Sequence, residues 1–197
     1  ARHAQWGRYR NPADRLTVAV AEDLSGPTGE SGRSESRGAA VLFDGVQKSY
    51  DGETLVVKDL HLEIASGEFL TMLGPSGSGK TTCLMMLAGF EPATHGEIYL
   101  DGQPINDLPP HKRGIGMVFQ NYALFPHMTV AENLAFPLKV RGMGKAEIAE
   151  RVQRALSMVE LPQMAGRRPA QLSGGQQQRV AVARALVFEP RLVLMDE

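Results

Sequence analysis

The stretch G74-P-S-G-S-G-K-T81 decides the fold, because it fits the pattern G-x-x-x-x-G-K-[ST]. The glycines let the backbone curl, so that successive N–H groups point inward and form a phosphate-binding nest with the start of the following helix. Lys80 would then reach the β- and γ-phosphates, and the Thr81 hydroxyl would bind magnesium. A chance match of this length is on the order of one in a hundred, which favours a phosphate site over a glycine-rich turn.

The segments on either side provide the setting that this phosphate loop, residues 74–81, requires. The apolar run 68–73 predicts a buried strand, and 81–88 predicts an apolar helix that ends at Gly89. The run 114–119 predicts another buried strand. Strand, helix and strand in that order predict a parallel sheet and an α/β fold class.

Upstream of the loop, residues 41–50 and 60–64 alternate apolar and polar side chains. This period of two is typical of half-buried antiparallel strands, and the D51-G52 pair between them favours a turn. The sequence therefore predicts that a small antiparallel β layer opens the domain.

Downstream of the loop the hydrophobic period becomes helical. Thr129 with Glu132 and Ser173 with Gln176 are two capping-box patterns, each of which marks the start of a helix. The final run L192-V-L-M-D-E197 predicts a buried strand that presents Asp196 and Glu197 at its carboxyl end. Asp196 would hold a magnesium-bound water, and Glu197 would polarise the attacking water.

Composition limits the range of functions. The 197 residues carry a formal charge of -1 and 43% hydrophobic content, which suits a globular core and argues against a nucleic-acid partner. The single cysteine, Cys83, forms no internal disulfide, and the cytosol is the expected compartment. Residues 1–38 are rich in arginine, glycine and serine and predict a mobile extension; a docking tail that uses Trp6 and Tyr9 is the alternative.

Two further stretches, V118-F-Q120 and L172-S-G-G-Q176, follow the phosphate loop in the chain. With them the sequence resembles the ATP-binding cassette (ABC) ATPases, from about Val41 to Glu197. The resemblance implies ATP and Mg²⁺ as cofactors, with Gln120 contacting magnesium beside Thr81 and Asp196. Lys80, Gln120 and Glu197 are the implied catalytic residues. The implied ATP-binding residues are Tyr50, stacked on adenine, and Gly74, Pro75, Ser76, Gly77, Ser78, Gly79, Lys80, Thr81 and Thr82.

The signature segment, Ser173, Gly174, Gly175 and Gln176, has a physical logic of its own. A serine at a helix start followed by bare glycine N–H groups forms a second anion site, and one chain does not need two. The resemblance implies a homodimer in which the signature segment of one subunit and the phosphate loop of the other enclose each ATP. An ordinary helix cap is the alternative for this segment.

Several single residues also have a plainer interpretation. Tyr50 could be a strand aromatic buried for packing, and Cys83 a small buried helix residue whose alkylation ATP would slow. His127 lies in N121-Y-A-L-F-P-H-M-T129, which resembles the family loop that meets the membrane subunit; packing within the loop is the alternative.

The stretches L87-A-G-F-E91, P109-P-H-K-R113 and Y122-A-L-F-P-H-M-T-V130 resemble ATPase subunits of bacterial solute importers, the spermidine/putrescine type above all. The resemblance implies integral membrane permease partners, an indirect periplasmic solute-binding protein, and a place on the cytoplasmic face of the bacterial inner membrane. A soluble ABC ATPase of DNA repair or translation, and a cassette that binds ATP without turnover, are the alternatives.

The resemblance also predicts the division of the chain. Residues 1–38 form the extension, 39–120 the β layer and first part of a RecA-like ATP-binding core, 121–187 a helical lobe with the signature segment, and 188–197 the last core strand. A family cassette continues past the acid pair to another strand that ends in a histidine. We therefore expect an amino-terminal portion of a longer ATPase, with an exposed apolar sheet edge and, by itself, weak nucleotide binding and little hydrolysis.

Overall fold

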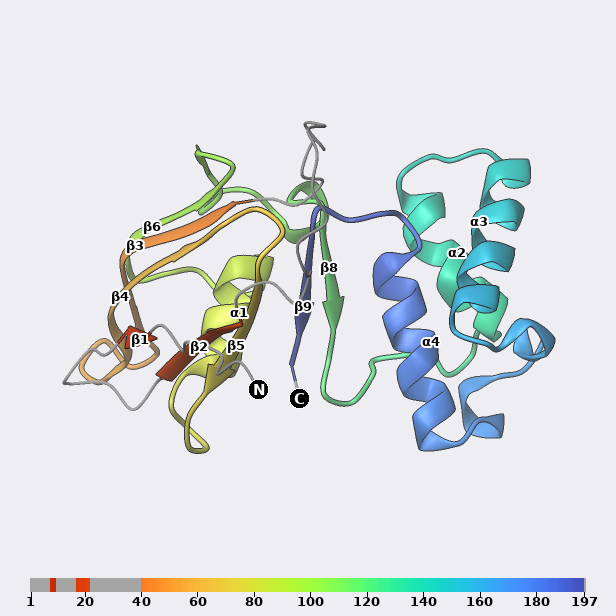
Figure 1. Ribbon diagram of the computed structural model, residues 1–197, viewed down its shortest axis with the longest axis horizontal. Helices are drawn as coiled ribbons and strands as arrows, with labels where there is room; N and C mark the ends of the chain where they lie inside the picture. Colours follow the sequence, from red (N-terminus) through yellow and green to blue (C-terminus); the bar gives the residue numbers. More distant parts are fainter. Residues whose placement is uncertain (1–7, 10–16, 22–39, 197) are drawn as a thin grey trace, which may run out of the picture. The chain divides into compact units, whose positions relative to one another are not determined.

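The computed structural model describes residues 8–9, 17–21 and 40–196. The chain forms two compact units, Ala1–Arg113 and Gly114–Glu197, which we describe separately (Figure 1). This division falls before the strand at 115–118, whereas the sequence predicted a boundary after Gln120. The difference arises because that strand packs with the last helix of the second unit.

The first unit contains the predicted antiparallel layer. Strands β3 (Val41–Ser49), β4 (Leu55–Ile64), β6 (His95–Leu100) and β7 (Gln103–Pro104) lie in the order β4-β3-β6-β7, and all neighbours are antiparallel. Alternate side chains of β3 and β4 are buried, as the period of two predicted. The turn between them is held by Asp51, whose carboxylate accepts from the N–H groups of Glu53 and Thr54. These bonds, that of Thr54 first, lower the pKa of Asp51 below its usual range.

The phosphate loop joins β5 (Phe69–Leu73) to α1 (Lys80–Ala88), so the predicted order of strand, loop and helix is confirmed. Gly89 ends the helix with a φ of +86°, and its N–H donates to Met85 and Met86. A short 3₁₀ helix, η1 (Pro110–Lys112), precedes the end of the unit.

Strand β5 belongs to an antiparallel sheet of order β1-β2-β5, with β1 (Arg8–Tyr9) and β2 (Thr17–Ala21), partners that the sequence analysis did not predict. The expectation that β5 is buried is wrong at Phe69, which is 70% exposed. An apolar run specifies a strand but not the edge with which its backbone pairs.

The strands β1 and β2 also correct the prediction of a mobile extension over 1–38 at these positions. The edge of β5 presents backbone N–H and C=O groups, and β2 pairs with β5 along the whole of β5, from Phe69 to Leu73. Residues 1–7, 10–16 and 22–39, with Trp6 among them, lie outside the part of the chain that the structure describes.

The second unit contains a pair of parallel strands and the predicted helices. Strands β8 (Ile115–Val118) and β9 (Leu192–Met195) are parallel, in the register Val118↔Met195. Both capping boxes are confirmed, at Thr129 before α2 (Val130–Val140) and at Ser173 before α4 (Gly174–Leu186). The remaining helices are α3 (Lys145–Met158), η2 (Pro162–Met164) and η3 (Pro169–Gln171).

The core of the second unit lies between α2, α3 and α4, which Figure 1 shows as one group. Helix α4 also packs against β8, and this approach depends on a glycine. A Cβ atom at Gly116 would lie 2.5 Å from the carbonyl oxygen of Ala185. Of the helices in the described part of the chain, none combines the length and the apolar character needed to cross a bilayer.

Candidate functional site

The backbone of the phosphate loop has the curled shape that its sequence predicts. Gly77 and Gly79 have φ values of +79° and +90°, a region that side chains with a Cβ rarely adopt. Gly79 also lies against β4, because a Cβ atom there would be 3.2 Å from both the Val56 carbonyl oxygen and a Val57 methyl group. Glycine is therefore required at position 79 for conformation and for space.

Lys80 folds back over this loop. Its Nζ atom donates to the carbonyl oxygens of Gly74 at 2.7 Å and Pro75 at 2.9 Å, and to the hydroxyl of Ser78 at 3.2 Å. The ammonium group is thus held above the same loop whose N–H groups are to bind phosphate. A fixed cation and a ring of backbone donors are the components of an anion site.

The start of α1 adds to this anion site. Gly79 is the N-cap and supplies no side-chain acceptor. The N–H groups of a helix's first turn point toward its amino end, where they favour an anion. Thr81 is exposed and Thr82 is half-buried. The arrangement suits a phosphate group on the loop, with the Thr81 side chain at its rim.

Tyr50 follows the end of β3, and the residue is 60% exposed. The alternative of a ring buried for packing is therefore wrong. The Lys48 ammonium lies 4.7 Å from the ring centroid and is itself held by Glu91 at 3.1 Å. Ser49 pairs with Leu55, one residue before the valine against which Gly79 packs, so the ring and the phosphate loop lie on neighbouring segments of one unit.

In the second unit, Gln120 and Asp196 follow the ends of paired parallel strands. The Asp196 N–H donates to the Val118 carbonyl oxygen at 3.0 Å, which extends the ladder by one residue. The carboxyl ends of parallel strands share one edge, where ligands of α/β sheets bind. Glu197, the predicted base, lies outside the described residues, and Thr81 belongs to the first unit.

Magnesium binds oxygen donors and keeps several of its waters. The hydroxyl of Thr81, the amide of Gln120 and the carboxylate of Asp196 are such donors. Within the described ranges no cluster of three or more His, Cys, Asp or Glu side chains forms a separate metal site.

The signature segment forms the start of α4. Ser173 accepts from the Gln176 N–H, and the Gln176 side chain accepts from the Ser173 N–H at 2.9 Å. Gly174 and Gly175 are exposed, and a Cβ atom at either position would meet nothing within 4 Å. Both glycines thus leave room beside the start of α4, whereas the Gln176 side-chain oxygen is occupied as a cap.

These elements recur together in known proteins. A family model described as "ABC transporter" matches residues 57–197, which is most of the chain. The chain belongs to this family. The predicted resemblance and the fold class, a P-loop ATPase of the cassette type, are thereby confirmed.

Relatives and solved structures agree with membership of the ABC transporter family. The chain is 53% identical to the sn-glycerol-3-phosphate import ATP-binding protein of Pectobacterium atrosepticum and 54% identical to that of Escherichia coli, in each case over 81% of its length. It spans 44% and 45% of those two relatives, less than half their length. These relatives do not support the assignment to the polyamine importers, which rested on the resemblance of short sequence stretches.

A dimeric ATP-binding cassette in a post-hydrolysis state, bound to ADP and Pi, has a similar fold. The TM-score is 0.70 at 38% identity, over 80% of this chain and 73% of that one. A second dimeric structure of the same bacterial ABC transporter cassette matches equally well.

Cys83 allows a chemical test of nucleotide binding in this ABC transporter chain. Its side chain is fully buried, and its N–H donates to Gly79 at the end of the phosphate loop. Alkylation therefore requires α1 to open, and we expect it to be slower than in denatured protein by about tenfold or more. ATP should slow it further, because a ligand that binds only the closed form stabilises that form.

The rate is measured by mass spectrometry of the intact chain after timed exposure to a maleimide, with and without ATP. A nucleotide-free buffer that contains inorganic sulfate at the concentration used for ATP serves as the control for ionic strength. An alkylation rate that ATP leaves unchanged would contradict the prediction.

Two polar side chains that hold the loop after Gln120 escaped the sequence analysis. Asn133 is fully buried on α2; its Oδ1 accepts from the Phe125 N–H at 2.8 Å, and its Nδ2 donates to Thr129 at 2.9 Å. Arg184 on α4 donates to the same loop, which follows β8. The signal that could have revealed them is a polar residue within an apolar helical run.

Proposed function

We propose that this chain is the ATP-binding part of the ATPase subunit of a bacterial ABC importer. Residues 74–82 bind the phosphates, Tyr50 stacks on the adenine, and Thr81, Gln120 and Asp196 hold magnesium. Glu197 activates the water that attacks the γ-phosphate. The observation that carries the proposal is the Lys80 ammonium held over a glycine loop at the start of α1, a geometry suited to a polyphosphate.

We also propose that ATP is hydrolysed in a homodimer. A second helix start, at Ser173, has two exposed glycines in its first turn, and one nucleotide site per chain leaves this second cradle without a ligand of its own. In a head-to-tail dimer of the whole protein, this cradle would contact the nucleotide on the other subunit. The related cassette of known structure is a dimer bound to ADP and Pi.

The transport role is supported by kinship. Both relatives named above are import ATP-binding proteins. We therefore place the whole protein on the cytoplasmic face of the inner membrane, bound to permease subunits to which a periplasmic binding protein delivers the solute. We propose sn-glycerol-3-phosphate as the solute, in place of a polyamine, because that is the solute those relatives' names give.

An uptake assay separates these possibilities. The full-length gene is expressed in a bacterium that lacks its own glycerol-phosphate import ATPase but retains the permease and binding protein. We expect uptake of radiolabelled sn-glycerol-3-phosphate to be restored, with putrescine uptake unchanged. Restoration of putrescine uptake in a host that lacks its own polyamine import ATPase would reverse the solute assignment. Co-purification of the full-length protein with ribosomes or DNA-repair factors, in place of permeases, would overturn the transport role.

A further inference from the structure

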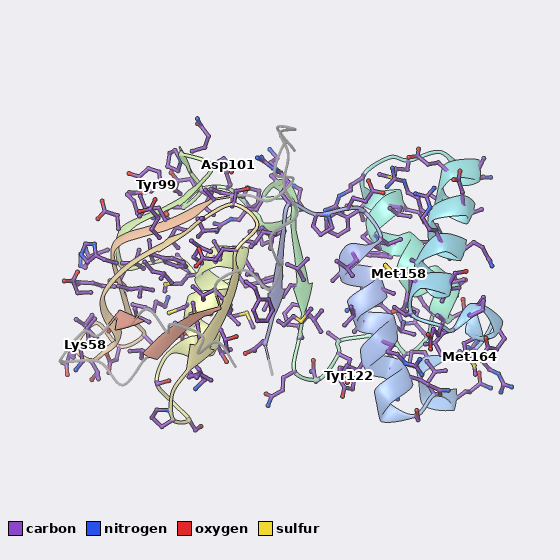
Figure 2. The ribbon with its side chains drawn as sticks, viewed as in Figure 1. Lys58, Tyr99, Asp101, Tyr122, Met158 and Met164 are labelled. Carbon is purple, nitrogen blue, oxygen red and sulfur yellow. The ribbon has the colours of Figure 1, made fainter. Side chains whose placement is uncertain are left out.

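A single guanidinium group holds the backbone that follows Gln120. Arg184 lies in the last turn of α4, and its Nη1 and Nη2 atoms donate to the carbonyl oxygens of Ala123 at 2.7 Å and Tyr122 at 2.9 Å. Figure 2 labels Tyr122 where the chain leaves β8. A planar fork that binds two successive carbonyl groups fixes both the position and the direction of this segment.

The segment is held in an unfavourable conformation. Tyr122 and Ala123 have φ values of +62° and +43°, although both carry a Cβ atom. Non-glycine residues adopt this left-handed region singly and rarely, and such strain persists only where the surroundings impose it. The two bonds from Arg184 provide that restraint at the residues where the strain lies.

The surroundings strengthen these bonds. Arg184 is half-buried, and its guanidinium carbon lies 5.7 Å from the Phe125 ring centroid. Burial lowers the pKa of Arg184 from its ordinary value, yet an arginine remains charged. Hydrogen bonds from a charged donor in a partly buried setting are stronger than neutral ones.

The same helix joins this restraint to the signature segment. Helix α4 begins after Ser173, and Arg184 lies near its other end. A hydrogen-bonded helix transmits a displacement of one end to the other, so the loop after Gln120 is tied to the second anion site.

We propose that Arg184 is a positioning residue for Gln120: through the carbonyl groups of Tyr122 and Ala123 it sets the place of the Gln120 side chain, and it couples that place to the helix that starts at Ser173. This inference rests on the proposed function, in which Gln120 binds the magnesium of the nucleotide.

The test uses the full-length protein with Arg184→Lys, which keeps the charge but lacks the fork. We expect the magnesium concentration that gives half-maximal ATPase activity to rise about tenfold, the factor that one lost charge-assisted bond would produce. Affinity for ATP without magnesium should be unchanged. The matched control is Arg179→Lys on the same helix, where an exposed guanidinium donates to one carbonyl oxygen, that of Val159 at 3.1 Å.

Hydrogen exchange gives a second readout that does not depend on activity. In Arg184→Lys the amides of residues 120–126 should exchange faster, while those of α3 keep their protection. Adding Ala123→Gly to Arg184→Lys should bring the half-maximal magnesium concentration part of the way back to the wild-type value, because glycine adopts the left-handed conformation without strain. A general loss of stability would give neither the segment-specific exchange nor this recovery.

The outcomes are distinguishable. A wild-type protein that binds no ATP would overturn the proposed function and with it this role of Gln120. A wild type that binds ATP, beside an Arg184→Lys variant with unchanged magnesium dependence and unchanged exchange at 120–126, would overturn the role of Arg184 alone.

Discussion

Replacing Lys80 with alanine is expected to lower the ATPase rate of the full-length protein by about 10²- to 10³-fold, the range found when one charge-stabilising donor is removed from an active site. The structure gives the physical reason. The Lys80 ammonium is held beside the loop by the carbonyl oxygens of Gly74 and Pro75, so its charge is fixed where the phosphates would bind.

The same substitution should weaken nucleotide binding, because it removes the loop's cation and three bonds that hold the loop closed. Steady-state phosphate release measures the rate, and a fluorescent ATP analogue measures the affinity. Lys112→Ala is the matched control, since Lys112 is an exposed lysine of the same unit in η1. A Lys80→Ala protein that retained the wild-type rate would exclude the phosphate loop as the hydrolytic site.

Much of the local structure follows from the sequence, because it depends on neighbouring residues. The capping boxes of Thr129 and Ser173 are fixed by a hydroxyl and a partner three residues later, and both form as predicted. The phosphate loop is likewise specified by glycines at positions where the backbone needs a positive φ. The candidate residues in each unit could therefore be located before any coordinates were known.

Pairing between distant segments was not predictable in the same way. The partner of β5 is β2, since a strand edge bonds through backbone groups that every residue carries. The acceptors of Arg184 and Arg113 are also backbone carbonyl groups, so no residue type marks them in the sequence. The positioning residues around Gln120 were missed for this reason, whereas Gln120 itself could be recognised.

Replacing Arg113 is expected to give the largest loss of stability of any single arginine in the described part of the first unit. Arg113 is buried, with 6% of the residue exposed. It donates to the carbonyl oxygens of Leu108 at 2.7 Å, Met86 at 2.8 Å and Leu87 at 2.9 Å, and to Asn106 at 3.1 Å. One side chain thus caps the carboxyl end of α1 and fixes the loop that follows β7.

Arg113→Met keeps the apolar part of the side chain but removes the guanidinium donor from all four carbonyl groups, of which that of Met86 keeps the Gly89 N–H. We expect the free energy of unfolding to fall by about 3 kcal/mol or more, because each unsatisfied buried polar group costs about 1–3 kcal/mol. Gly89→Ala should act in the same direction, since a Cβ atom there would lie 2.6 Å from the Arg113 Nε atom. Urea unfolding followed by circular dichroism measures both variants.

Arg154→Met provides the contrast. Arg154 pairs with Glu150 at 2.7 Å on α3, but its side chain is 65% exposed, and such surface pairs contribute about 0.5 kcal/mol or less. Both changes remove one arginine and introduce the same side chain, so the difference between them reports what the burial and the four backbone hydrogen bonds of Arg113 contribute. Equal shifts of the unfolding midpoint in the two variants would mean that the carbonyl groups around Arg113 find water or other donors when the guanidinium is removed. In that case the end of α1 would owe its stability to the Gly89 cap and the buried residues of the helix rather than to Arg113.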